Sequence, residues 1–204
     1  MPYSKLKNLY VEKIIEDIIF TGKVLYNEGL VNSHAGNISV RFEDDIYITK
    51  TGAMLGFLKP DDIVEVPVFS TSENDKQASS ELIVHRAIYK KTEAKAIIHA
   101  HPVYAVALTF LLEEKFIPID NEGKLFVGEV PILDLEHASG SKELAEKLSD
   151  MFKKTGKNIV LIKKHGSFVI YDNLNYALKL TSDLEFCAKI FSLVENQKKI
   201  LNKN

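Results

Sequence analysis

Apolar residues recur every three or four positions along five stretches of the chain, which is the spacing of helices with one buried face. The first stretch runs from Leu6 to Glu28, and Gly29 follows it where a left-handed helix cap forms most easily. The four later helices are predicted over residues 82–91, 102–114, 141–154 and 174–201. Ser79 or Ser80 is expected to cap the second helix, because a serine oxygen can accept a hydrogen bond from a first-turn amide.

Shorter stretches alternate apolar and polar residues, which predicts half-buried strands. NISVR and DIYITK flank a turn at Glu43 and Asp44 and are typical of a hairpin. Further strands are expected over residues 63–69, 95–100, 126–133, 158–164 and 167–171. This order of elements predicts an α/β fold in three layers, α/β/α, with a central and mainly antiparallel sheet between the helices. No repeat or linker divides the sequence, so we expect a single domain over residues 1–204.

The composition is typical of a soluble globular protein. The chain has 204 residues, of which 46% are hydrophobic, and a net charge of -2. This balance provides no general attraction to nucleic acid or to a membrane surface, and no stretch approaches the roughly 18 apolar residues of a membrane span. Cys187 is the one cysteine, so no disulfide can form within the chain, as suits a cytoplasmic protein. We therefore expect a small-molecule partner that binds at a local site.

Two histidines in the segment IIHAHP are candidate metal ligands. His99 and His101 lie two positions apart on a predicted strand, so both imidazoles can point to the same side. A catalytic zinc ion needs a third protein ligand, and His165 at the end of the strand NIVLIKK is the best candidate. Isolated HxH sequences also occur without a metal. The other histidines, His34, His85 and His137, are expected to be surface or hydrogen-bonded residues.

Several turns combine small and hydroxyl residues, and each allows two interpretations. Glu81 follows two serines at a helix start, where it can either compensate the helix dipole or act beside an anion-binding site. Gly36 and Asn37 precede a strand, and Thr51 and Gly52 follow one. Both pairs fit ordinary turns, but amides and hydroxyls at such turns also bind anions.

The order of the motifs GNxS, TG, SSE, HxH and HG resembles the class II aldolase/adducin family, and the resemblance extends from GLVNSHAGNISVR to the last helix. It implies that His99, His101 and His165 bind one Zn2+ per subunit and that Glu81 is the catalytic acid/base. It implies further that the substrate phosphate is bound by Asn37, Thr51, Gly52, Ser79 and Ser80, with Gly36 shaping the first of these turns.

The resemblance implies a zinc-dependent lyase that cleaves a phosphorylated ketose to dihydroxyacetone phosphate and an aldehyde. The metal would stabilise the enediolate that remains after C–C cleavage. A sugar-phosphate dehydratase and a non-catalytic, adducin-like binding domain are the alternatives. The segment FIPIDNEGKLFVGEVPIL lacks the tyrosine that aldolases of this family use at the aldehyde end. The resemblance also implies a homotetramer with active sites between subunits.

Overall fold

The stretches in which apolar and polar residues alternate form the strands of one sheet. Among residues 3–202, which the computed structural model describes, eight strands are hydrogen-bonded in the order β3-β2-β1-β4-β8-β7-β6-β5. Neighbouring strands run antiparallel except β6 and β7, so the expectation of a mainly antiparallel sheet is confirmed. The strands are β1 (Asn37–Phe42), β2 (Asp45–Thr49), β3 (Ile63–Pro67), β4 (Ala96–Ala100), β5 (Lys115–Phe116), β6 (Val130–Leu133), β7 (Ile159–Ile162) and β8 (Gly166–Tyr171).

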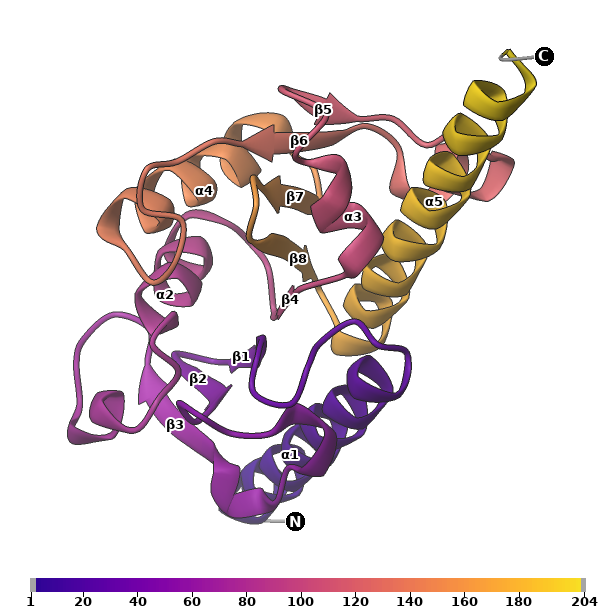
Figure 1. The fold of residues 1–204 in the computed structure, drawn as a ribbon. Coiled ribbons are helices and arrows are strands. Elements are labelled where there is room, and N and C mark those ends of the chain that lie inside the picture. The colour runs from indigo at the N-terminus through magenta and orange to yellow at the C-terminus, as the bar shows by residue number, and fades with distance from the viewer. Residues whose placement is uncertain (1–2, 203–204) are drawn as a thin grey trace.

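Helices cover both faces of this sheet (Figure 1). The two faces are separate clusters of buried residues, because successive side chains of a strand point to opposite sides. In β4, Ile98 belongs to one cluster and Ile97 to the other. The predicted three-layer α/β/α architecture is therefore confirmed. One layer contains α1 (Tyr3–Asn27), α3 (Val103–Leu108) and α5 (Leu174–Leu201), and the other contains α2 (Leu82–Lys91) and α4 (Lys142–Thr155).

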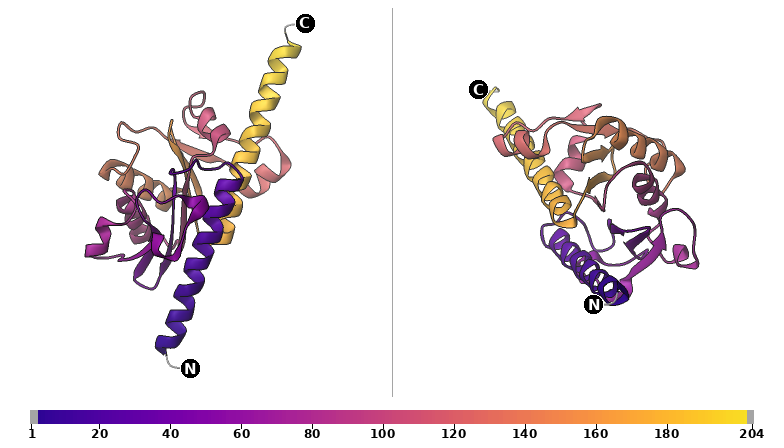
Figure 2. Two further views of the ribbon diagram at one scale, coloured as in Figure 1. Left: turned by 60° about the horizontal axis from the view of Figure 1, so that its bottom comes forward. Right: turned by 180° about the vertical axis from the view of Figure 1, so that it is seen from behind.

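The first and last helices lie along the same side of the molecule, and the C-terminal part of α5 projects beyond the sheet (Figure 2). Their apolar residues are buried where they cover the sheet, as at Ile18 of α1 and Leu184 of α5. Leu193, Ile200 and Leu201, near the end of α5, are exposed. No helix within residues 3–202 combines the length and the apolar character that crossing a membrane requires.

Three segments differ from their predicted form. The helix expected over 102–114 ends at Leu108, where the backbone hydrogen bonds change to the tighter pattern between residues three apart, as in the bonds from Phe110 to Ala107 and from Leu111 to Leu108. The strand expected over 126–133 begins only at Val130, since residues 123–127 form a π-helical turn that Gly128 ends at a φ of 64°. The short strand β5 was not predicted, because two residues carry no periodicity.

The predicted loops contain short helical turns. Residues 51–62 include 3-10 turns at Leu55–Phe57 and Pro60–Asp62, and residues 70–78 include one at Glu73–Lys76. The hairpin of β1 and β2 turns at Glu43 and Asp44 as predicted. These loops therefore change the predicted architecture only locally.

Candidate functional site

Strand pairing brings distant parts of the chain to one end of the sheet. Asn37, at the start of β1, lies opposite His99, near the end of β4. Strand β4 also pairs with β8, so His101, which directly follows β4, lies beside the turn that joins β7 to β8. That turn holds His165. The topology therefore places the three predicted metal ligands at the same end of the sheet.

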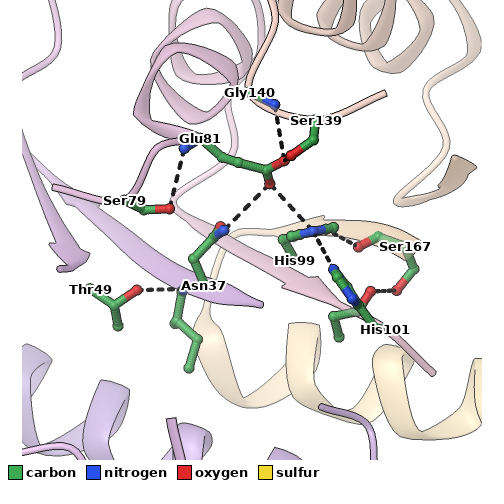
Figure 3. Close-up of polar contacts among 11 residues, drawn as sticks. Asn37, Thr49, Ser79, Glu81, His99, His101, Ser139, Gly140 and Ser167 are labelled. Atoms are coloured by element: carbon green, nitrogen blue, oxygen red, sulfur yellow. Dashed lines mark hydrogen bonds and ion pairs between the residues drawn. The ribbon is translucent and has the colours of Figure 1, made fainter. Parts of the chain in front are cut away.

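The three imidazole rings are close enough to share one ion. The ring centroid of His99 lies 4.7 Å from that of His101 and 4.8 Å from that of His165, and the third separation is 5.0 Å. One nitrogen of each ring lies within 4.8 Å of the other two. The Nε2 atoms of His99 and His101 are 2.9 Å apart (Figure 3). The structure thus brings together the residues that the sequence predicted to converge.

The surroundings of His99 and His101 favour neutral rings. Nδ1–H of His99 donates to the carbonyl of Ser167 at 3.0 Å, which leaves a lone pair on Nε2. Burial lowers the pKa of His99 well below its usual value, and the neighbouring imidazoles lower it further. Burial and His165 lower the pKa of His101 to about 4. A neutral imidazole is the form that binds a metal ion.

Gly166 allows the strands to approach closely behind this cluster. A Cβ atom at this position would lie 2.5 Å from the carbonyl oxygen of Ala100. It would also lie 2.9 Å from the His101 ring and 3.0 Å from Cε1 of His99. The glycine of the HG motif therefore fits because any side chain here would displace the histidine pair.

Glu81 is buried beside the histidine cluster. Its Oε2 atom lies 3.4 Å from Nε2 of His99 and accepts a hydrogen bond of 3.4 Å from the Asn37 amide (Figure 3). The prediction that Ser79 or Ser80 caps α2 is wrong, because Glu81 occupies the cap position and no side chain bonds the first turn. Ser79 Oγ instead accepts the amide N–H of Glu81 at 3.3 Å. The serine fixes the backbone from which the carboxylate extends.

A hollow of about 220 Å³ opens next to Glu81 and the three histidines. Glycines and hydroxyl or amide side chains from three turns form much of its wall. His34 and Lys50 also line the hollow, and the sequence analysis did not single out Lys50. The hollow is lined by all six residues predicted to surround the phosphate: Gly36, Asn37, Thr51, Gly52, Ser79 and Ser80.

The loop between β6 and α4 also reaches Glu81. Ser139 Oγ donates to Oε1 of Glu81 at 3.3 Å, and the Gly140 N–H donates to the same oxygen at 3.2 Å. No spacing in the sequence pointed to these residues. SGS before a helix predicts only a cap, and indeed Ser141 caps α4 by accepting the Leu144 N–H. The contact with Glu81 depends on how α4 packs against α2.

The remaining histidines behave as expected. His34 and His137 are exposed. His85 is fully buried, and its Nδ1 lies 2.7 Å from Ser39 Oγ, which in turn lies 2.8 Å from the Tyr89 hydroxyl. His85 is therefore a hydrogen-bonded residue beneath the candidate site.

Known proteins resemble the chain over most of its length. The family described as Class II Aldolase and Adducin N-terminal domain matches residues 16–192. An L-fuculose phosphate aldolase of Methanocaldococcus jannaschii is 34% identical over 167 residues, which are 81% of this chain and 88% of that protein. A 3-oxo-tetronate 4-phosphate decarboxylase of Haemophilus influenzae is 32% identical over 189 residues, 90% of this chain and 89% of its own. These relatives confirm the expectation of an enzyme of the lyase class.

The fold leads to the same group of proteins. The crystal structure of L-fuculose-1-phosphate aldolase from Thermus thermophilus matches with a TM-score of 0.86 and 32% identity, covering 92% of this chain and 97% of that one. The sequence motifs, the eight-stranded sheet and the matched relatives thus agree. The chain belongs to the class II aldolase/adducin family.

Proposed function

We propose that His99, His101 and His165 bind one Zn2+ per chain. The donor set supports this assignment. The three imidazoles converge, and the hydrogen bond from Nδ1–H of His99 to Ser167 leaves its Nε2 without a proton. In the part of the chain that the structure describes, Nδ1 of His165 is buried without a hydrogen-bond partner, as suits a nitrogen that awaits a ligand. Three histidines would hold the ion and would leave it able to bind the substrate as well.

The activity that this geometry supports best is cleavage of a phosphorylated ketose of the L-fuculose 1-phosphate kind to dihydroxyacetone phosphate and an aldehyde. The observation that carries the proposal is a buried carboxylate, Glu81, within 3.4 Å of a three-histidine cluster. A bound divalent ion supplies positive charge that stabilises negative charge on the ketone oxygen of the substrate. As the C–C bond breaks, the carbon that becomes the aldehyde loses its hydroxyl proton and the carbon left beside the ketone gains one. Glu81 would deliver the proton to that carbon, for which a carboxyl group within hydrogen-bond reach is required.

The phosphate group would occupy the hollow beside Glu81. Its wall offers the hydroxyls of Thr51, Ser79 and Ser80 and the turn at Gly52. Hydroxyls and backbone amides at such turns bind phosphate without a dedicated lysine. Lys50 also lines the hollow and adds positive charge to it. The phosphate would thereby orient the ketone toward the histidines.

Glu81→Gln tests this proposal. We expect the purified, zinc-loaded protein to release dihydroxyacetone phosphate from a ketose 1-phosphate, measured by coupled reduction. The variant should lose at least about a hundredfold in kcat, because glutamine can neither take up nor release the proton, and should still bind zinc. Equal cleavage by both proteins would show that Glu81 takes no part in the reaction. If neither protein cleaves any of a panel of ketose 1-phosphates, the proposed aldolase activity is wrong.

Decarboxylation is the second candidate, since a relative that is 32% identical is named a 3-oxo-tetronate 4-phosphate decarboxylase. The two reactions need the same groups, because each breaks a bond to the carbon beside a carbonyl and leaves negative charge there. Glu81 would protonate that carbon after loss of CO2. Product analysis separates the reactions, as decarboxylation releases CO2 and the aldolase releases dihydroxyacetone phosphate. Dehydration of a sugar phosphate would yield neither product.

The homotetramer with sites between subunits remains a prediction. Apolar side chains on the surface of α3, of the segment after it and of α5 support it, because exposed apolar patches commonly mark subunit interfaces. Light scattering on the purified protein should give four times the mass of one chain, and a monomer would rule the tetramer out. The exposed side chains are Val103, Phe110, Leu111, Ile117, Leu125, Phe126 and Phe186.

A further inference from the structure

The two oxygens of the Glu81 carboxylate have different neighbours (Figure 3). Oε2 faces His99 and the Asn37 amide, both at 3.4 Å. Oε1 faces away from the histidines and accepts hydrogen bonds from Ser139 Oγ at 3.3 Å and from the Gly140 N–H at 3.2 Å. The carboxylate therefore spans the distance between the histidine cluster and the loop that joins β6 to α4.

The backbone of this loop is shaped for the contact. Gly140 has a φ of 56°, in the left-handed region that favours glycine, and a Cβ atom there would lie 3.0 Å from the Ser80 carbonyl oxygen. The next residue, Ser141, caps α4 and donates to the carbonyl of His137 at 2.6 Å. The loop is thus fixed to α4 on one side and lies against the start of α2 on the other.

We infer that Ser139 and Gly140 are positioning residues for Glu81: they hold Oε1 so that Oε2 stays directed toward the histidines and the substrate carbon. This inference rests on the proposed role of Glu81 in proton transfer. A glutamate side chain has three rotatable bonds, and two donors on one oxygen restrict its rotation. The backbone N–H of Gly140 can only donate, so it holds Oε1 as a hydrogen-bond acceptor.

The chemical benefit is precise placement. Displacing a reacting group by about 1 Å can lower a rate by roughly a hundredfold. Glu81 is 3% exposed, whereas Ser139 is exposed and contacts the carboxylate through one hydroxyl. Removing that hydroxyl therefore changes the placement of the carboxylate with little effect on buried packing. The Gly140 N–H would still donate to Oε1, so we expect kcat to fall only in part.

The test compares Ser139→Ala with Ser139→Thr, which keeps the hydroxyl, and with Glu136→Gln in the same loop as a control. For zinc-loaded Ser139→Ala we expect kcat to fall roughly tenfold to a hundredfold, with KM and bound zinc unchanged. Ser139→Thr and Glu136→Gln should stay within about threefold of the unmodified protein. An unchanged kcat in Ser139→Ala, or equal losses in Ser139→Ala and Ser139→Thr, would overturn the inference.

Crystal structures of the same variants decide the question independently of turnover. In Ser139→Ala the Glu81 side chain should leave its place beside His99 or occupy several positions, and in Ser139→Thr it should keep its place. A Glu81 carboxylate that is undisturbed in Ser139→Ala would contradict the inference. If the unmodified protein cleaves none of the ketose phosphates, the proposed function fails, while the structures still show whether Ser139 positions Glu81.

Discussion

At the scale of single residues, the candidate site needs a residue without a side chain next to the histidines. Gly166 is that residue, because its missing Cβ leaves room for the carbonyl of Ala100 and for the rings of His99 and His101. The HG motif thus combines a predicted ligand, His165, with the space that the two other predicted ligands require.

Gly166→Ala should therefore disturb metal binding. We expect zinc affinity to fall at least about tenfold and the free energy of unfolding to fall by roughly 1–3 kcal/mol, as for other overpacked sites. Competition with a chromogenic chelator measures the affinity, and urea denaturation measures the stability. Gly156→Ala is the control for zinc affinity, because a Cβ there meets nothing within 4 Å, although its left-handed φ of 63° should lower the stability of this variant too. Equal zinc affinity in the two variants would contradict this account of the glycine.

At the scale of elements, one threonine connects two segments that hold the histidines. Thr109 is fully buried after α3, the helix that follows His101. Its Oγ1 donates to the carbonyl of Val106 at 2.7 Å and accepts the N–H of Lys164 at 2.8 Å. Lys164 lies in the turn before His165 and has a φ of 60°. The end of α3 therefore supports the turn that presents His165.

Thr109→Val removes both hydrogen bonds at nearly constant volume. It should lower the free energy of unfolding by roughly 1–3 kcal/mol, because the Lys164 N–H loses its acceptor. Zinc affinity should also fall, since the turn that carries His165 loses its support. Thr109→Ser, which keeps the hydroxyl, should restore the affinity. A Thr109→Val protein that binds zinc normally would show that His165 is held by other contacts.

Sequence patterns predicted the elements that have a strong period. The α/β/α layers, the hairpin at Glu43 and the long helices follow from side-chain alternation or from helical spacing. Segments whose form depends on tertiary contacts were missed, as at Thr109 and around Gly128. The same holds for the candidate site, because the family motifs named Glu81 but not Ser139. The contact between those two residues exists only after α4 has packed against α2.

At the scale of the whole molecule, buried histidines make stability depend on pH. Burial lowers the pKa of His85 from 6.5 to about 3. Between these values the unfolded chain binds a proton at His85 that the folded chain does not. This proton uptake favours the unfolded chain, so the free energy of unfolding falls as the pH drops from 6.5 toward 3. Above pH 6.5 His85 is neutral in both states and does not affect it. The loss reaches up to about 1.4 kcal/mol per pH unit.

His85→Asn isolates this effect, because asparagine offers Ser39 a hydrogen-bond acceptor and does not titrate in this range. Urea denaturation at about pH 7 and about pH 5, with a chelator present, should show a larger loss of stability in the unmodified protein than in the variant. His99 and His101, whose pKa values burial also lowers, are present in both proteins, so the difference between the two curves reports mainly on His85. Parallel stability curves would mean that His85 takes up its proton while the protein remains folded.

The central claim is that three imidazoles from two distant parts of the chain hold one metal ion. Equilibrium dialysis against zinc, followed by metal analysis, tests it most directly on the unmodified protein and on His165→Ala, with His137→Ala as an exposed control. We predict one zinc per chain in the unmodified protein and in His137→Ala, and a loss of at least about a hundredfold in affinity for His165→Ala. A His165→Ala protein that retains a full equivalent of tightly bound zinc would contradict the claim.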